Sequence, residues 1–247
     1  MRKEGGKRIQ RGPRATTPLV SIISVVYRAS SALVPLMESI FSHASSDTEI
    51  IVIDGGSGDA TVDLLERWGD KIDYWLSEKD AGLYDAMNKG ISAATGEYLL
   101  HLNAGDNLCW IPSSHLIECK ADKVDVVCFD VLIDKERIFH PATGFLLRIA
   151  NTWHHQGTFY RRSCHPGYDT KYRVYSDFDV NQKLYRSGCK VRIYPGTVAG
   201  FSTGGNSSRV ARKEIYSIVC KNYGLVYVPI AFARFQRDKL RSALFST

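Results

Sequence analysis

The chain has 247 residues, of which 44% are hydrophobic, and its net charge is +6 with neutral histidines. This length and composition predict one globular domain with a large buried core. No apolar run approaches the roughly 20 residues that span a bilayer, and residues 1–18 contain no signal-peptide-like stretch, so we expect a cytoplasmic protein. The six cysteines include no CxxC pair, which argues against a zinc site or a disulfide framework.

Basic residues are concentrated at both ends of the chain. The first fourteen residues hold six basic residues and one acid, and the last fourteen hold four basic residues and one acid. We interpret residues 1–17 as a disordered, solvated tail and residues 226–247 as a basic helical segment. In the latter, Arg234, Arg237 and Arg241 share one helical face, which suits either an anionic membrane surface or packing against the domain. We expect no nucleic-acid partner, because no aromatic residues are interleaved with the charges.

The first half of the chain alternates short apolar strands with amphipathic helices. The predicted strands are 19–27, 49–54, 72–77 and 98–103, and the predicted helices are 32–43, 59–68 and 83–94. Such alternation forms βαβ units, so we expect an α/β fold with a mostly parallel sheet flanked by helices.

The pattern loosens after residue 106. Further strands are predicted at 124–131, 190–194 and 197–202, and further helices at 177–186, 209–222 and 229–245. Residues 137–158 show no regular period. We expect one catalytic domain over residues 18–225.

Polar stretches fall at the ends of several predicted strands and at the start of one helix. They are residues 51–61, 77–90, 99–106 and 175–188. Ligands of open α/β sheets bind beyond the carboxyl ends of the strands, so we expect these stretches to meet at one site.

The turn after the second strand begins with Asp54 and continues GGSGDAT. Its glycines allow close backbone approach to a ligand, and a carboxylate at this place can accept hydrogen bonds from a base or a ribose. Asp59 is better explained as a helix cap. The turn is not a dinucleotide-binding fingerprint, because the required third glycine is replaced by Thr61. Tyr27, at the end of the first strand, suits either stacking on a base or a place in the core or at its rim.

Two acids have both a structural and a chemical interpretation. Asp106 closes the turn LNAGD and could bind a divalent cation or simply form the turn. Asp177 opens a helix within the pattern Ser176-x-x-Asp179, so it could belong to a helix cap or act as a general base.

Together and in this order, these segments resemble the family 2 glycosyltransferases with the GT-A fold, in particular the bacterial branch that builds exopolysaccharides such as colanic acid. The likeness covers residues 18–223 and is most specific over residues 80–106. By this resemblance, Tyr27 stacks on the base of the donor and Asp54 recognises its base or ribose. Asp80, Asn88 and Gly90 match the segment that contacts the donor.

The resemblance also implies a metal, an acceptor side and a base. Asp106 matches the acid that contacts Mg²⁺ or Mn²⁺, His155 and Gln156 lie in the acceptor-side loop, and Asp177 matches the base of inverting members. The chain departs from the pattern at Asn103 and Gly105, where many relatives have acids.

The implied function is inverting transfer of a hexose from a nucleotide sugar, with UDP as the expected nucleotide. The implied acceptor is a hydroxyl of a surface polysaccharide carried on a polyprenyl diphosphate, which places the enzyme peripherally at the inner face of the cytoplasmic membrane. The alternatives are a nucleotidyltransferase and a non-catalytic nucleotide- or glycan-binding domain. A nucleotidyltransferase should carry a glycine-rich basic loop after the first strand, and residues 27–35 are not such a loop. A non-catalytic binding domain would need neither Asp106 nor Asp177.

Overall fold

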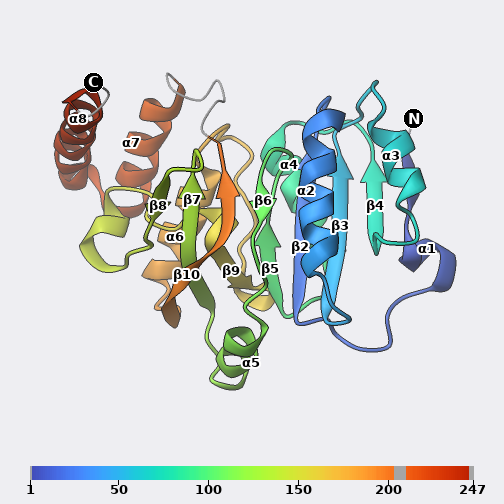
Figure 1. Cartoon of the computed structure of the whole chain (residues 1–247). Helices are drawn as coiled ribbons and strands as arrows, with labels where there is room; N and C mark the ends of the chain where they lie inside the picture. The colour runs from blue at the N-terminus through green and yellow to red at the C-terminus, as the bar shows by residue number, and fades with distance from the viewer. Residues whose placement is uncertain (1, 203–209, 245–247) are drawn as a thin grey trace.

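The computed structural model describes residues 2–202 and 210–244. In this part of the chain a ten-stranded sheet has the order β1-β4-β3-β2-β5-β9-β7-β10-β6, with β8 paired to β7 (Figure 1). The strands are β1 (Lys3–Gly5), β2 (Val20–Val26), β3 (Thr48–Asp54), β4 (Tyr74–Ser77), β5 (Tyr98–His101), β6 (Asn107–Leu108), β7 (Val126–Ile133), β8 (Arg137–Phe139), β9 (Thr158–Arg161) and β10 (Val191–Phe201).

Helices cover both faces of this sheet. They are α1 (Lys7–Arg11), α2 (Ser30–His43), α3 (Thr61–Arg67), α4 (Leu83–Ala93), α5 (Ser113–Ala121), α6 (Ser176–Arg186), α7 (Val210–Tyr223) and α8 (Val228–Leu244). Short 3₁₀ helices are η1 (Gly144–Arg148), η2 (His155–Gly157), η3 (Arg162–Cys164) and η4 (Leu225–Tyr227).

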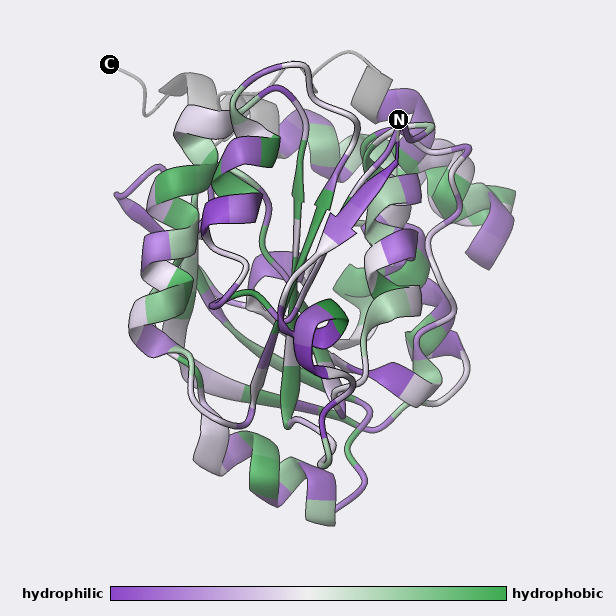
Figure 2. Cartoon of the chain, turned by 90° about the vertical axis from the view of Figure 1, so that its right-hand side faces the viewer, coloured by the Kyte–Doolittle hydropathy of each residue, from purple (hydrophilic) through white to green (hydrophobic). Residues whose placement is uncertain are grey.

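The centre of the sheet is parallel, as the alternating pattern predicts. β2 pairs in parallel with β3 and β5, β3 pairs with β4, and β10 pairs with β7. Every residue of β2 and β3 is buried, which is typical of parallel strands covered on both faces. Figure 2 shows hydrophobic residues along these central strands and mixed hydropathy along the surrounding helices.

β9 makes the sheet mixed, because it lies antiparallel between β5 and β7. The chain reaches β9 through residues 134–157, which form no crossover helix, and a parallel connection usually needs one. The two strands predicted at 190–194 and 197–202 form one strand, β10, whose register shifts around Pro195. Proline lacks the N–H that a ladder needs, so the pattern breaks there without ending the strand.

The core has a layer on each face of the sheet. One layer packs α2 and α5 against β2, β3 and β7, and the other packs α4 and α6 against the opposite side of the same strands. A third cluster joins α6, α7 and α8 through Phe178, Ile218, Val219 and Ala231. Within the described part of the chain, no helix is long and apolar enough to cross a membrane.

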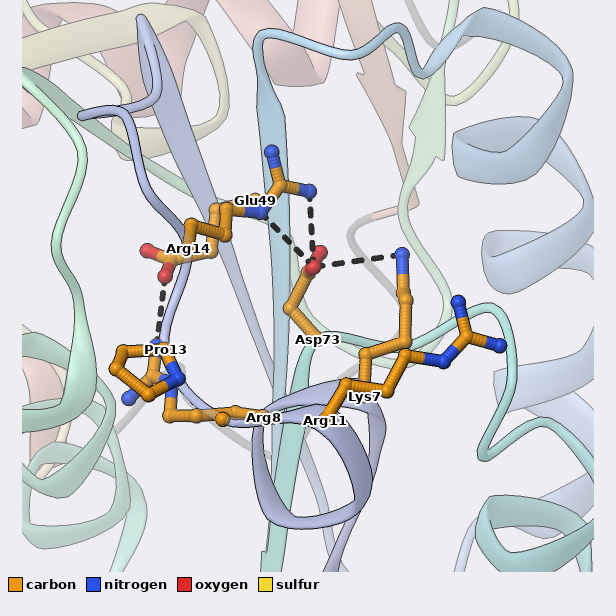
Figure 3. Close-up of a pocket in the computed structure, with 8 residues that line it drawn as sticks. Lys7, Arg8, Arg11, Pro13, Arg14, Glu49 and Asp73 are labelled. Atoms are coloured by element: carbon orange, nitrogen blue, oxygen red, sulfur yellow. Dashed lines mark hydrogen bonds and ion pairs between the residues drawn. The ribbon is translucent and has the colours of Figure 1, made fainter.

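The prediction of a disordered tail over residues 1–17 is wrong where the structure describes this segment. β1 adds to the edge of the sheet antiparallel to β4, and α1 follows it. Arg8 contacts Glu49 at 2.6 Å, and Arg14 contacts Asp73 at 2.8 Å (Figure 3). Both acids are buried, and a buried carboxylate needs charged or hydrogen-bonding partners. The basic residues therefore supply the partners of two acids far away in the sequence.

Candidate active site

A cavity of about 470 Å³ opens at the carboxyl ends of β2 and β3, beside the start of α4. Its lining comes from the end of β2 and from two of the four polar stretches, residues 51–61 and 77–90. The lining residues are Val25, Val26, Tyr27, Gly55, Lys79, Asp80, Gly82, Leu83 and Ala86. The Tyr27 side chain is 56% exposed, so it stands at the rim and is not a core residue. The Arg28 guanidinium lies over its ring at 5.2 Å from the centroid, and the exposed part of the ring remains available to stack on a planar ligand.

Asp80 lies at the same cavity, held against the turn that follows β3. Its Oδ1 accepts a hydrogen bond of 2.9 Å from the N–H of Gly82. A Cβ added at Gly55 would lie 2.5 Å from Asp80 Oδ2, so only glycine lets this carboxylate approach the backbone so closely. Asp80 and Gly55 thus form one wall of the cavity.

Asp54 is fully buried beneath that wall and already has protein partners. It accepts hydrogen bonds from the backbone N–H and hydroxyl of Ser57 and from the hydroxyl of Ser77 at 2.6 Å. These bonds shape the turn and tie β3 to β4; recognition of a base or ribose by Asp54 stays a prediction. Asp59 accepts from the N–H and hydroxyl of Thr61 at the start of α3, and these bonds lower its pKa despite some loss of solvation.

Asn88 and Gly90 lie elsewhere on α4 and do not line the cavity. The Asn88 amide accepts from the N–H of Tyr168 at 2.8 Å and donates to its carbonyl at 2.9 Å. A Cβ at Gly90 would lie 2.3 Å from Ile23 Cγ2, so this glycine lets α4 pack closely on β2. Packing explains both residue types, and their contact with the donor stays a prediction.

A second group of predicted residues is brought together around His155. Asp106 follows β5, and its Oδ2 accepts the N–H of Asn103 at 2.7 Å while its Oδ1 lies 3.5 Å from Gln156 Nε2. His155 Nδ1 lies 3.5 Å from Asp177 Oδ2, and its Nε2 lies 3.4 Å from Asn103 Nδ2. His155 thus stands between the residues around Asp106 and the carboxylate of Asp177.

The electrostatics of this group follow from its burial. Burial raises the pKa of Asp106, because the charged carboxylate loses solvation. Burial also opposes charge on His155, but the hydrogen bond to Asp177 and the negative charges of Asp177 and Asp106 outweigh it and raise the His155 pKa. A histidine between two carboxylates therefore holds its proton more tightly than in water.

The structure shows one structural role of Asp177, and its role as a base stays a prediction. The residue before α6, Tyr175, makes no side-chain cap, and the buried Ser176 hydroxyl has no hydrogen-bond partner among the described residues, so the capping box suggested by the sequence is not formed. Asp177 Oδ1 accepts the N–H of Phe178 at 2.9 Å, and Oδ2 accepts from Asn151 Nδ2 at 2.9 Å. Asp177 therefore satisfies one first-turn N–H of α6 with Oδ1, while Oδ2 lies beside Asn151 and His155. Asp179 points to α7 instead, where it contacts Lys221 at 3.2 Å.

Two residues with amide side chains lie beside Asp106, Asn103 through its backbone N–H and Gln156 through Nε2. Within the described part of the chain, Asn103 Oδ1 and Gln156 Oε1 are buried without hydrogen-bond partners. The same part contains no cluster of three histidine, cysteine or acidic residues that could hold a metal. One carboxylate with two amide oxygens suits Mg²⁺ or Mn²⁺, which prefer oxygen ligands and keep several waters. By the family resemblance, Gln156 lies on the acceptor side and Asn103 only replaces an acid. In the structure both residues contact the Asp106 carboxylate.

A second cavity, of about 370 Å³, lies on another side of Asp106, between α2 and the ends of β7 and β10. Its lining is partly apolar, with Pro35, Leu132 and Phe201, and it includes Lys135. Asp106 therefore borders a hollow distinct from the one that Tyr27 and Asp80 line.

Comparison with known proteins agrees with this geometry. Residues 21–108 match the family model described as Glycosyl transferase family 2. Over 210 residues the chain is 30% identical to a PGL/p-HBAD biosynthesis glycosyltransferase of Mycobacterium bovis BCG, with 80% of this chain and 82% of the relative covered.

Solved structures show the same fold at low sequence identity. TarS of S. aureus has a TM-score of 0.64 at 14% identity, and the match covers 81% of this chain but 39% of the TarS chain. The mannosyltransferase PcManGT from Pyrobaculum calidifontis, solved with GDP-Man and Mn²⁺, has a TM-score of 0.62 at 17% identity, over 92% of this chain and 74% of that one. The chain therefore belongs to glycosyltransferase family 2 and is a nucleotide-sugar-dependent glycosyltransferase with the GT-A fold.

Proposed function

We propose that this glycosyltransferase moves a hexosyl group with inversion of configuration, using Asp177 as general base. The observation that carries the proposal is the position of Asp177. His155 contacts the buried Asp177 carboxylate through Nδ1 and Asn103, beside Asp106, through Nε2. The two acids therefore lie on either side of one histidine, although they are far apart in the sequence. A base on one side of the sugar and a leaving-group site on the other is what a single displacement requires.

The donor is proposed to be a UDP-sugar whose nucleoside occupies the cavity beside Tyr27. Tyr27 would stack on the base, Asp80 lies within reach of the sugar nucleotide, and Asp54 holds the turn beneath them. TarS has been solved with UDP-GlcNAc and PcManGT with GDP-Man, so the fold accepts either nucleotide, and UDP is our choice between them.

The cofactor is proposed to be Mg²⁺ or Mn²⁺, held by Asp106 with the free oxygens of Asn103 and Gln156. PcManGT, which has the same fold, was solved with Mn²⁺. When bound, the ion offsets the negative charge that grows on the departing diphosphate. These metal ligands include fewer carboxylates than the metal motif of many relatives, so we expect the metal ion to bind weakly and to exchange readily.

The chain's own residues account for the proton and for orientation. As the acceptor hydroxyl attacks the anomeric carbon, its proton passes to Asp177, and the bond from that carbon to the diphosphate breaks on the opposite face. The sugar passes through an oxocarbenium-like transition state. His155, whose pKa is raised by its contact with Asp177, lies between Asp177 and the side where the diphosphate leaves.

The acceptor is proposed to be a hydroxyl of a lipid-linked surface glycan of the exopolysaccharide type, met at the inner face of the cytoplasmic membrane. The cavity beside Asp106 supports the lipid-borne character of the acceptor, because its apolar lining and Lys135 suit the lipid-phosphate end, while the acceptor hydroxyl itself would lie at Asp177. One relative, similar over 44% of this chain, is a cholesterol galactosyltransferase of Borreliella burgdorferi, and its name supports a lipid-borne acceptor.

Hydrolysis of a panel of sugar nucleotides (UDP-glucose, UDP-galactose, UDP-GlcNAc and GDP-mannose) tests the proposal. Asp177→Asn should lower kcat by about 10²–10⁴-fold, because asparagine cannot accept the proton, and should leave the melting temperature and donor binding nearly unchanged. EDTA should abolish turnover and Mn²⁺ should restore it, whereas Asp106→Asn should stay inactive with added Mn²⁺.

Asp179→Asn is the matched control on the same helix. It removes a buried charge that Lys183 and Lys221 pair with, so it should lower the melting temperature while kcat stays near the wild-type value. If Asp177→Asn retains full turnover, Asp177 is not the base; if Asp179→Asn alone is inactive, the base lies two residues further along α6.

A further inference from the structure

We propose that Asn151 and Asn181 are positioning residues that hold the Asp177 carboxylate in place through a chain of side-chain hydrogen bonds. This inference rests on the proposed role of Asp177 as the base. Asn151 Nδ2 donates to Asp177 Oδ2 at 2.9 Å, and Asn181 Nδ2 donates to Asn151 Oδ1 at 2.9 Å. Tyr160 completes the chain, because its hydroxyl donates to Asn181 Oδ1 at 2.7 Å.

The direction of every bond in this chain is determined by its ends. Asn181 Nδ2 also donates to the backbone carbonyl of Trp153 at 2.8 Å, and a carbonyl can only accept. Asn181 must therefore present its NH₂ group to Asn151, which turns the Asn151 oxygen toward Asn181 and the Asn151 NH₂ group toward Asp177. An ionised carboxylate likewise only accepts, so flipping either amide would bring two acceptors face to face.

The chain is anchored in rigid parts of the fold. Tyr160, on β9, and Asn181, on α6, are both fully buried, as is Trp153. Asn181 follows Asp177 by four residues on α6, so the two side chains share one face of the helix. Asn151, the one half-buried member, spans the gap between them. The orientation of the base is thus tied both to its own helix and to the sheet.

The consequence for the reaction is a carboxylate with both oxygens oriented. Asp177 Oδ1 is held by the N–H of Phe178 and Oδ2 by Asn151. The Tyr84 hydroxyl lies 3.4 Å from Oδ1, but its single proton goes to the carbonyl of Val174 at 2.6 Å. Without Asn151, Oδ2 would keep only its 3.5 Å contact with His155 Nδ1, so the carboxylate would be free to turn. A small misplacement of a reacting group costs much of its effect on rate.

Two variants break the chain at different links. Asn151→Ala removes the donor to Asp177, and Asn181→Asp keeps the shape of the side chain but removes both of its donated bonds. Each should lower kcat for hydrolysis of the sugar nucleotide that the wild type turns over by about 10–100-fold, with KM unchanged, because the lost contact acts on the transition state and not on donor binding. The double variant should be no slower than the slower single variant, since the two residues act in series.

The background of Asp177→Asn separates positioning from general loosening. With the base removed, neither Asn151→Ala nor Asn181→Asp should lower the residual rate further. The matched control is Gln182→Met, which removes buried side-chain bonds from α6 to the carbonyls of Leu147 and Arg148 without touching the chain. It should lower the melting temperature but leave kcat within a factor of about two of wild type.

The outcomes distinguish this inference from the function on which it rests. If the wild type and Asp177→Asn hydrolyse the panel equally, the proposed function fails. If Asp177→Asn is inactive but Asn151→Ala and Asn181→Asp match Gln182→Met, the positioning role is overturned. The NMR resonance of the Asn151 side-chain amide tests the hydrogen-bond chain without an activity measurement. It should shift in both Asp177→Ala and Asn181→Asp, and an unchanged resonance in either would contradict the chain.

Discussion

At the scale of single residues, His101 shows what a buried polar group does when the fold gives it no partner. It ends β5 beneath the site, is fully buried, and neither ring nitrogen has a hydrogen-bond partner among the described residues. Its neighbours are the rings of Tyr168 and His165, at 5.4 and 6.1 Å between centroids. Burial, with a smaller contribution from His165 and His155, lowers its pKa well below the ordinary 6.5, so His101 is neutral in the folded protein.

This burial predicts a loss of stability in acid. The unfolded chain binds a proton at His101 near pH 6.5 and the folded chain does not, so the stabilising contribution is complete above that pH and is lost as the pH falls below it. His101→Phe should therefore weaken the dependence of the urea midpoint on pH between pH 7.5 and pH 5. His43→Phe, at an exposed histidine of α2, should leave that dependence unchanged. An equal slope in wild type and His101→Phe would show that His101 is protonated in the folded state.

At the scale of elements, α8 and the short helix η4 bear on whether the C-terminal segment packs on the domain or contacts a membrane surface. α8 packs on α7, since Ala231 is buried with Ile218 and Val219, so this segment does pack on the domain. Yet Leu225 is 73% and Val226 80% exposed in η4, and Phe232 on α8 is half exposed. The apolar residues that remain outside suit contact with a lipid surface, in agreement with the proposed acceptor. The predicted place of Arg241 on the shared face of this helix lies outside the side chains that the structure describes.

Flotation with vesicles of phosphatidylglycerol and phosphatidylcholine tests this contact. The wild type should float with anionic vesicles, less so in high salt, and Leu225→Ser with Val226→Ser should lose most of the bound fraction, because about 0.8 kcal/mol is lost for each CH₂ withdrawn from the lipid. Ile117→Ser on α5 is the control, since Ile117 is 57% exposed but α5 lies far from α8 (Figure 1). Equal flotation of wild type and the η4 variant would exclude η4 as the contact.

At the scale of the whole molecule, the N-terminal segment closes the sheet on the side away from β6. β1 covers the edge of β4, and the chain then passes the amino ends of β3 and β4, where Lys7 and Arg14 converge on Asp73 (Figure 3). Glu49 is 1% exposed; it forms an ion pair with Arg8 and accepts hydrogen bonds from the hydroxyl of Ser21 and the backbone N–H of Thr95. These contacts lie opposite the carboxyl ends that form the site, so they serve stability and not chemistry.

Deleting residues 1–15 should therefore destabilise the domain without altering its mechanism. Removing one partner of a buried ion pair costs about 3–5 kcal/mol, so urea unfolding should show a loss of at least that size. In the shortened chain, Glu49→Gln with Asp73→Asn should recover part of the loss, because the uncompensated charges are gone. Below the unfolding transition the shortened chain should keep the wild-type kcat. An unchanged urea midpoint would mean that the segment is dispensable.

Much of the candidate site was predictable because each acid follows a recognisable local pattern. Asp106 comes directly after a buried strand and Asp177 opens an amphipathic helix, and the structure brings both to His155. Asn88 and Gly90 share an equally suggestive segment, yet their roles depend on Tyr168 and on Ile23, which no local pattern connects to them. Asn151 gives no signal in the sequence, because an asparagine in an irregular segment is ordinary.

The sequence by itself determined the element types over residues 19–103 and the parallel centre of the sheet, since hydrophobic periodicity is a property of neighbouring residues. It also determined the family, through residues that stand at strand ends and in their turns. Only the tertiary structure decided that β9 lies antiparallel between β5 and β7, that Arg8 and Arg14 pair with Glu49 and Asp73, and that Asn181 directs Asn151 toward Asp177. These pairings join residues distant along the chain, and their energies depend on burial and direction, which exist only once the sheet and its helices have packed together.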